Sequence, residues 1–169
     1  MSVSGASRLF RYWLPVVLWM AVIFGASTDL MSEKHTSRFI GPFLRWLKPD
    51  ISQETIVLVQ AIVRKGGHVT EYAILAILLW RALRARQQGA AAGWSWSAAR
   101  VALLLATLYA ASDEFHQYFV ASRYASVWDV VLDSAGASVG LVLIWAHGRM
   151  LAWRSRRRGT GSSLAMENC

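Results

Sequence analysis

Four hydrophobic runs divide the chain, and together they predict an all-α fold. The runs cover residues 11–27, about 68–83, about 98–120 and about 126–150, and each approaches the roughly 20 apolar residues that a membrane-spanning helix needs. The first run also fits a cleaved signal peptide, since a basic residue precedes it and the small residues Gly25, Ala26 and Ser27 end it. Its length and its tryptophans favour a permanent helix. The pattern therefore predicts a polytopic membrane protein with about four transmembrane helices.

The polar connection after the first run contains one amphipathic segment. Over residues 33–48 apolar side chains recur at helical spacing, with basic side chains on the opposite face. The apolar set is Phe39, Ile40, Phe43, Leu44, Trp46 and Leu47, and the basic set is Arg38, Arg45 and Lys48. Such a helix lies flat at a membrane interface or covers a bundle, so we expect an interfacial helix that roofs the bundle.

Residues 52–86 are compatible with one helix or with two. The sequence Pro-Asp-Ile-Ser at 49–52 is typical of a helix start, with Asp50 or Ser52 as the N-cap. One helix over this range would be about 50 Å long at 1.5 Å per residue, which is more than a bilayer needs. We therefore expect a break or kink at Gly66-Gly67, between a first helix of about 52–64 and a span that starts at residue 68.

The composition supports a membrane protein. Hydrophobic residues make up 55% of the 169 residues and charged residues 17%, whereas soluble domains carry about a quarter charged residues. The net charge of +8 indicates membrane topology and contact with anionic lipid, and the chain contains no nucleic-acid-binding motif. Because Cys169 is the only cysteine, the chain has no internal disulfide.

The distribution of Lys and Arg predicts the orientation. We divide the chain into an N-terminal segment (1–10), a transmembrane domain (11–150) and a basic tail (151–169). With four spans, both termini and the loop at 84–97 share one side, which holds eleven of the 18 basic residues. The N-terminus and the C-terminus are therefore expected in the cytoplasm, and the protein in the cell membrane.

Polar residues from three separate segments fall at the predicted outer end of the spans. They are Lys65, His68, Tyr72, Asp113, Glu114, Gln117, Arg123, Asp129 and Asp133. A carboxylate in hydrocarbon costs roughly 2.5–3.5 kcal/mol, so the four acids must face one another, water or a basic partner. Helical spacing places the members of each segment on a shared face. Gly136 and Gly140 form a small-xxx-small groove, which predicts close helix packing.

In order and spacing, these residues resemble the VanZ-like membrane protein family over about residues 11–147. The matching elements are Lys65-x-x-His68-x-x-x-Tyr72, then Ser112-Asp113-Glu114-x-x-Gln117, then Arg123, Asp129, Gly136 and Gly140. A weaker match is Ser27-Thr28, where the family tends to carry two serines. The resemblance implies a small multi-span bacterial membrane protein. The family is named for a member tied to low-level teicoplanin resistance, and the name does not supply a reaction.

The polar residues predict a site for a lipid-linked or cell-wall-related anionic ligand at the outer leaflet. Lys65 and Arg123 would hold its phosphate or carboxylate, with Tyr72, Gln117, Asp129 and Asp133 as further binding residues. His68 with Asp113 or Glu114 would move protons, so these three are the catalytic candidates.

Three other interpretations of the same residues stay open. The charges could form a structural salt-bridge network in a non-enzymatic accessory membrane protein. An ion or proton pathway is disfavoured, because no comparable polar residues continue through the cytoplasmic halves of the spans. A divalent metal on the carboxylates is also disfavoured, since Lys65 and Arg123 compete for the same oxygens, and the sequence identifies no cofactor.

Overall fold

The computed structural model describes residues 5–27, 33–86, 93–119 and 126–166, and in these ranges it contains five α-helices and no strand. The helices are α1 (Gly5–Ser27), α2 (Glu33–Leu47), α3 (Gln53–Arg86), α4 (Trp96–Gln117) and α5 (Val127–Met166). The all-α class predicted from the sequence is therefore confirmed. The last helix continues past residue 150, where the fourth hydrophobic run ends, into the basic tail.

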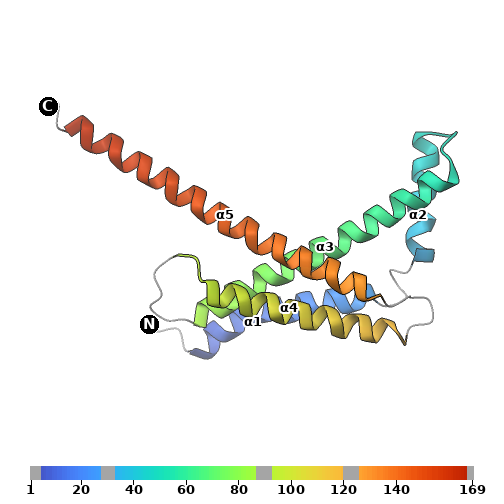
Figure 1. Ribbon diagram of the computed structural model, residues 1–169, viewed down its shortest axis with the longest axis horizontal. Coiled ribbons are helices and arrows are strands. Elements are labelled where there is room, and N and C mark those ends of the chain that lie inside the picture. Colours follow the sequence, from blue (N-terminus) through green and yellow to red (C-terminus); the bar gives the residue numbers. More distant parts are fainter. Residues whose placement is uncertain (1–4, 28–32, 87–92, 120–125, 167–169) are drawn as a thin grey trace.

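The bundle consists of α1, α3, α4 and α5, and α2 lies beside it. Figure 1 shows α1 and α4 running in one direction and α3 and α5 running in the other, so the end of α4 lies near the start of α5. The most extensive contact joins α3 and α5, and α4 packs against both of them. The core contains many small residues, and Ala76, Ala102, Ala106, Ala110 and Ala137 are fully buried. Small side chains let the helix backbones approach closely.

The predicted break at Gly66-Gly67 is wrong, because α3 continues as one helix of 34 residues. Each glycine costs only about 1 kcal/mol relative to alanine inside a helix, and the packed C-terminal half of α3 can offset that cost. The start of α3 follows the sequence pattern, with Ser52 as the N-cap. Its hydroxyl accepts a hydrogen bond of 3.2 Å from the backbone N–H of Thr55.

Helix α5 crosses α3 at its two buried glycines. A Cβ atom added to Gly136 would lie 2.8 Å from the Cα of Val69, and one added to Gly140 would lie 2.8 Å from the Cα of Ala73. Real Cβ atoms do not make such contacts with a backbone, so only glycine fits at either position. The close helix contact expected from the small-xxx-small spacing is present.

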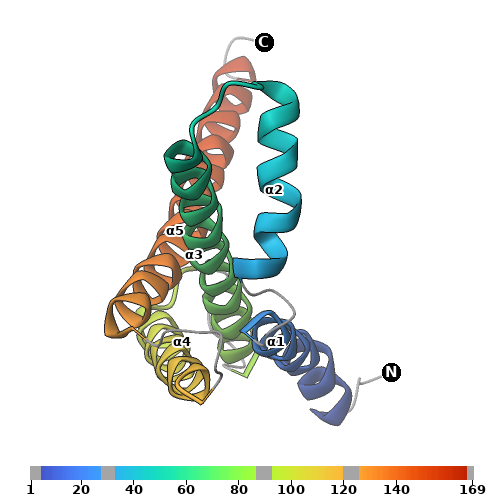
Figure 2. The ribbon, with the colours of Figure 1, turned by 90° about the vertical axis from the view of Figure 1, so that its right-hand side faces the viewer.

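Helix α2 packs on α3 alone among the described helices. The contact lies near the start of α3, where Gly41 faces Ile56 and Gln60. Figure 2 shows α2 standing beside α3. The predicted helix is therefore confirmed. The prediction that it covers the bundle is wrong for α4 and α5, because α2 contacts neither of them.

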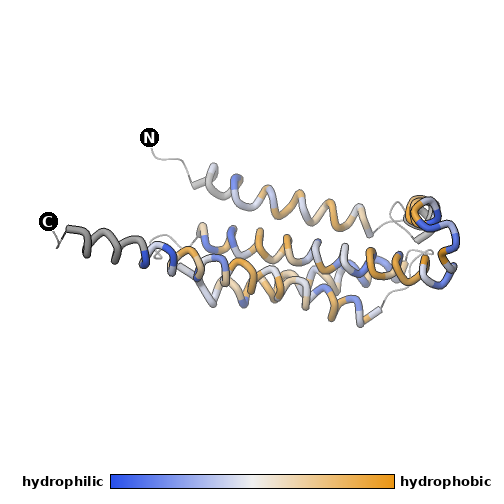
Figure 3. The backbone as a smooth tube through the Cα atoms, turned by 90° about the horizontal axis from the view of Figure 1, so that it is seen from above, coloured by the Kyte–Doolittle hydropathy of each residue, from blue (hydrophilic) through white to orange (hydrophobic). Residues whose placement is uncertain are grey.

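Two of the described helices contain an apolar stretch long enough to cross a membrane, Phe10–Ser27 in α1 and Val127–Ser155 in α5. Polar residues shorten the apolar stretch of α4, which has Arg100 near its start and Asp113 near its end. Figure 3 shows hydrophobic residues along the middle of the bundle and hydrophilic ones toward its ends.

Candidate functional site

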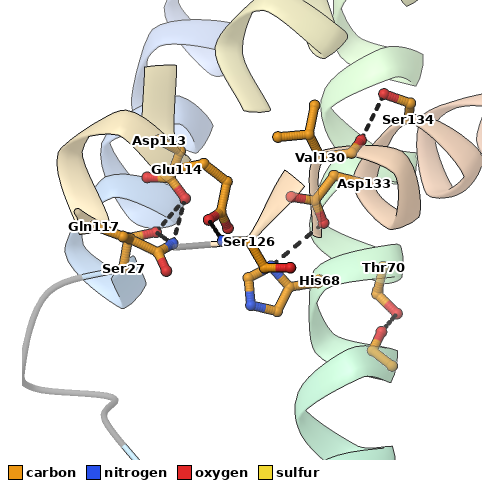
Figure 4. Close-up of polar contacts among 11 residues, drawn as sticks. Ser27, His68, Thr70, Asp113, Glu114, Gln117, Ser126, Val130, Asp133 and Ser134 are labelled. Carbon is orange, nitrogen blue, oxygen red and sulfur yellow. Dashed lines mark hydrogen bonds and ion pairs between the residues drawn. The ribbon is translucent and has the colours of Figure 1, made fainter. Parts of the chain in front are cut away.

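One end of the bundle gathers polar side chains from three helices, as Figure 4 shows in close-up. We call this set the polar cluster. Its members are His68 and Tyr72 of α3, Asp113, Glu114 and Gln117 of α4, and Asp129 and Asp133 of α5. The carboxylates lie close enough to repel one another: the charges of Asp113, Asp129 and Asp133 act on Glu114, and those of Asp113 and Asp133 act on Tyr72.

Asp113 connects α4 to the end of α1. The hydroxyl of Ser27 donates a hydrogen bond of 2.6 Å to Oδ2 of Asp113, and the amide of Gln117 donates one of 3.0 Å to the same oxygen. All three side chains are buried. Asp113 and Gln117 are four residues apart, so they share a face of α4. This contact joins the last residue of α1 to the polar cluster.

Glu114 connects α4 to the start of α5. Its Oε2 accepts a hydrogen bond of 2.8 Å from the backbone N–H of Ser126, the residue before α5. The hydroxyl of Ser126 in turn accepts one of 3.3 Å from the backbone N–H of Trp128. The first backbone N–H groups of a helix lack partners within the helix, so Glu114 satisfies one such donor from a neighbouring helix.

His68 and Asp133 face each other where α3 and α5 approach. Nδ1 of His68 lies 3.3 Å from Oδ1 of Asp133, an ion-pair distance without hydrogen-bond geometry. Asp133 is only 1% exposed. It stands three residues before Gly136, so the close crossing of the two helices brings these side chains together. Glu71 and Asp129 also act electrostatically on His68.

The polar cluster holds more acceptors than donors. Within the described residues no hydrogen bond reaches Oδ1 of Asp113, Oε1 of Glu114, either carboxylate oxygen of Asp133 or the hydroxyl of Tyr72. Leaving a buried polar atom without a partner costs about 1–3 kcal/mol, and more for a charged group. The chemistry of the site therefore suits a group that brings N–H or O–H donors to these oxygens.

Of the two basic residues of the predicted site, one is described by the structure and lies outside the polar cluster. The side chain of Lys65 is exposed, one turn before His68, and within the described residues it forms no ion pair with Asp113 or Asp129. Arg123 lies outside the described residues. Ser112 is exposed as well, and its hydroxyl donates to the carbonyl of Tyr109 in its own helix.

Sequence reasoning missed two contacts that tie α1 to the site. The hydroxyl of Tyr109 donates a hydrogen bond of 2.6 Å to the carbonyl of Met20, and the indole of Trp19 donates one of 2.9 Å to the carbonyl of Glu71. Both acceptors are backbone atoms, whose positions no sequence pattern reveals. These contacts make α1 an integral part of the bundle.

Among the residues that the structure describes, no three His, Cys, Asp or Glu side chains come together as a group able to hold a metal ion. The polar cluster offers carboxylate and hydroxyl oxygens, the amide of Gln117 and the imidazole of His68.

Comparison with known proteins identifies a family. The family model for VanZ/LLP1 matches residues 12–151, which include every member of the polar cluster and both buried glycines of α5. No curated protein and no solved structure matches the chain.

Proposed function

The chain belongs to the VanZ/LLP1 family, and on that basis we propose that it is an integral membrane protein of the cell envelope. Its polar cluster binds the headgroup of a lipid-linked or cell-wall-related anionic ligand at the outer leaflet. A link to glycopeptide (teicoplanin) resistance is part of the proposal.

The outer surface of the bundle supports the membrane location. Large apolar side chains are exposed along α1, α4 and α5, among them Leu18, Val22, Leu104, Leu108 and Leu143. A soluble protein rarely exposes so many large apolar side chains on one bundle. We propose four spans, formed by α1, residues 68–83 of α3, α4 and the first part of α5. Both termini then face the cytoplasm, as the basic residues predict.

The unpartnered acceptors of the polar cluster are the observation that carries the ligand proposal. Asp113, Glu114 and Asp133 are buried and retain oxygens that no described donor reaches. A headgroup with hydroxyl or ammonium groups beside its phosphate satisfies these oxygens. The exposed ammonium of Lys65, together with Arg123, pairs with the phosphate itself.

His68 is the residue that would transfer a proton, if the bound ligand reacts. Its imidazole is partly exposed and close to Asp133, an arrangement that orients the ring for acid–base work. Asp113 and Glu114 supply the second proton-transfer group. Binding does not require this chemistry, so binding and processing are separate tests.

Binding is tested with purified full-length protein in phosphatidylcholine nanodiscs, to which a polyprenyl phosphate that carries a sugar is added, so that the sugar hydroxyls supply the donors. We expect Lys65→Gln to weaken the retention of polyprenyl phosphate about tenfold, because it removes one charge-assisted hydrogen bond. Lys48→Gln is the matched control, since Lys48 is an exposed lysine just after α2. Equal retention by both variants and the unaltered protein would contradict the binding proposal.

The role of His68 is tested in cells that express the protein under teicoplanin. We expect His68→Gln to abolish protection at unchanged levels of folded protein, whereas His147→Gln, at an exposed position in the middle of α5, leaves it intact. Protection that survives His68→Gln would exclude a proton-transfer role.

A structural role for the polar cluster is the second candidate, and a specific observation favours it. Its contacts join different segments: Ser27 with Asp113, Glu114 with Ser126, and His68 with Asp133. Exchanging the last pair (His68→Asp with Asp133→His) tests this candidate. Full recovery of stability and teicoplanin protection in the exchanged protein would favour a structural network, since a ligand site would not tolerate the exchange.

A further inference from the structure

The end of the bundle opposite the polar cluster contains a cavity of about 470 Å³. It lies between the end of α3, the residues that lead into α4, and α5. Figure 1 shows α5 leaving the bundle in this region, beyond its crossing with α3. We call it the tryptophan cavity, and its main lining residues are Trp80, Arg84, Trp94, Trp96, Trp145 and Arg149.

Aromatic stacking builds the wall of this cavity. The rings of Trp80 and Trp94 stack with centroids 5.1 Å apart, and Trp96 meets Trp94 edge-on at 5.5 Å. The indole N–H of Trp80 also donates a hydrogen bond of 3.4 Å to the carbonyl of Ser95. The wall is therefore held by contacts between α3 and the start of α4.

The polar groups of the tryptophan cavity are donors. The guanidinium of Arg84 lies 5.4 Å from the ring centre of Trp80, and that of Arg149 lies 6.0 Å from the ring centre of Trp145. The buried indole nitrogen of Trp94 has no acceptor among the described residues. None of the described residues that line the cavity is an aspartate or a glutamate. Two cations and an unused N–H donor favour an anion with several acceptor oxygens.

A second pocket of about 270 Å³ adjoins the tryptophan cavity. The two share Trp94, Trp96 and Trp145 in their walls. The second pocket extends between α4 and α5 along Leu103, Leu141 and Val142. Its lining is almost entirely apolar apart from Arg100 and Ser138, so it suits a hydrocarbon chain.

From these two adjoining pockets we infer that this end of the bundle binds an anionic diacyl phospholipid. Arg84, Arg149 and the indole N–H of Trp94 bind its phosphate, and the apolar pocket between α4 and α5 holds one acyl chain. Tryptophan and arginine suit the boundary between headgroups and hydrocarbon, because each presents an apolar body with a polar tip. The site lies at the far end of the bundle from the polar cluster and does not depend on its function.

Native mass spectrometry of the full-length protein in detergent, titrated with dioleoylphosphatidylglycerol or dioleoylphosphatidylcholine, tests this site. We expect the unaltered protein to retain phosphatidylglycerol preferentially. Arg84→Gln with Arg149→Gln should lower that preference about tenfold, because two charge-assisted contacts are lost. The matched control is Arg154→Gln with Arg157→Gln, which makes the same charge change on α5 outside the cavity. Arg157 likewise stacks on a tryptophan, Trp153, at 4.0 Å.

Equal losses in the two double variants would show diffuse attraction to anionic lipid and would overturn the inference. No loss in either would overturn it as well. A pair of substitutions on α5 tests the acyl-chain pocket separately. It also tests the inference if the double arginine variant does not fold. Val142→Trp should fill the apolar pocket and lower phosphatidylglycerol retention about fivefold or more, whereas Val139→Trp, exposed and outside the lining, should not. Equal retention by these two variants would contradict a bound acyl chain.

Discussion

Two pairs of glycines lie in helices that touch, and they have opposite effects on the structure. In α5, Gly136 and Gly140 are buried against the backbone of α3. A Cβ atom added to Gly136 would lie 2.8 Å from the Cα of Val69, and one added to Gly140 would lie 2.8 Å from the Cα of Ala73. In α3, a Cβ added to Gly66 or Gly67 would meet nothing within 4 Å. The first pair allows two helices to approach, whereas the second pair only removes side chains from a helix surface.

Spacing explains the difference. Residues four apart lie on one face of a helix, so Gly136 and Gly140 form a continuous groove. Adjacent residues point about 100° apart, so Gly66-Gly67 forms no groove. The pair in α3 costs helix stability without a packing gain. It stands directly between Lys65 and His68, and an added Cβ there meets no atom within 4 Å.

The largest expected effect is at the crossing of α3 and α5. Gly140→Leu should lower the free energy of unfolding by about 3 kcal/mol or more, because the new side chain would overlap the backbone of Ala73 and force the helices apart. Gly148→Leu is the control, since a Cβ there meets nothing within 4 Å. Unfolding in mixed detergent micelles, followed by circular dichroism, measures both variants. Similar stabilities for the two would mean that the glycine groove does not fix the position of α5.

A smaller loss is expected where α1 meets the polar cluster. Asp113→Ala removes the shared acceptor of Ser27 and Gln117. The buried hydroxyl of Ser27 then lacks an acceptor, and the amide of Gln117 keeps only its longer hydrogen bond of 3.4 Å to that hydroxyl, so the change should cost about 2 kcal/mol. Asp50→Ala, at an exposed position before α3, should change stability by less than about 0.5 kcal/mol. The same unfolding assay compares the two. An unchanged stability in Asp113→Ala would show that this contact contributes no net energy and would strengthen a ligand-binding role for the carboxylate.

The glycines also show how far sequence reasoning reaches. The groove of Gly136 and Gly140 was predictable, because both residues lie on one face of one helix. The local sequence could not show that α3 continues through Gly66-Gly67. Each glycine lowers helix stability by about 1 kcal/mol, and tertiary packing outweighs that cost. The unbroken course of α3 depends on contacts with α1, α4 and α5 that no local pattern contains.

The two ends of the bundle also differ in how far the sequence reveals them. The members of the polar cluster carry family-like spacing within each helix, so the sequence pointed to them before their contacts were known. The tryptophan cavity combines Trp80, Trp94 and Trp145 from three separate segments, and no spacing rule connects them. A cluster of tryptophans around 94–96, close in sequence to Arg84, was the one available signal.

A gain in stability is expected at the second glycine pair. Gly66→Ala and Gly67→Ala should each raise the free energy of unfolding by about 1 kcal/mol, because alanine has the higher helix propensity and the added methyl group meets no atom. Thermal unfolding of each single variant and of the double variant measures the effect. A loss of stability would mean that these positions are covered in the folded protein. A gain that comes with weaker polyprenyl phosphate binding would place the glycines in the path of the ligand.

The smallest expected effect concerns a hydrogen bond between α4 and α5. The hydroxyl of Ser134 donates to the carbonyl of Val130 at 2.7 Å, so in its contact of 3.1 Å with Thr107 the hydroxyl of Thr107 must be the donor. Thr107→Val keeps the side-chain shape and leaves no donor without a partner, so it should cost only about 0.5 kcal/mol. The same detergent unfolding assay applies. A loss as large as that of Gly140→Leu would mean that polar contacts, rather than the glycine groove, determine where α5 packs.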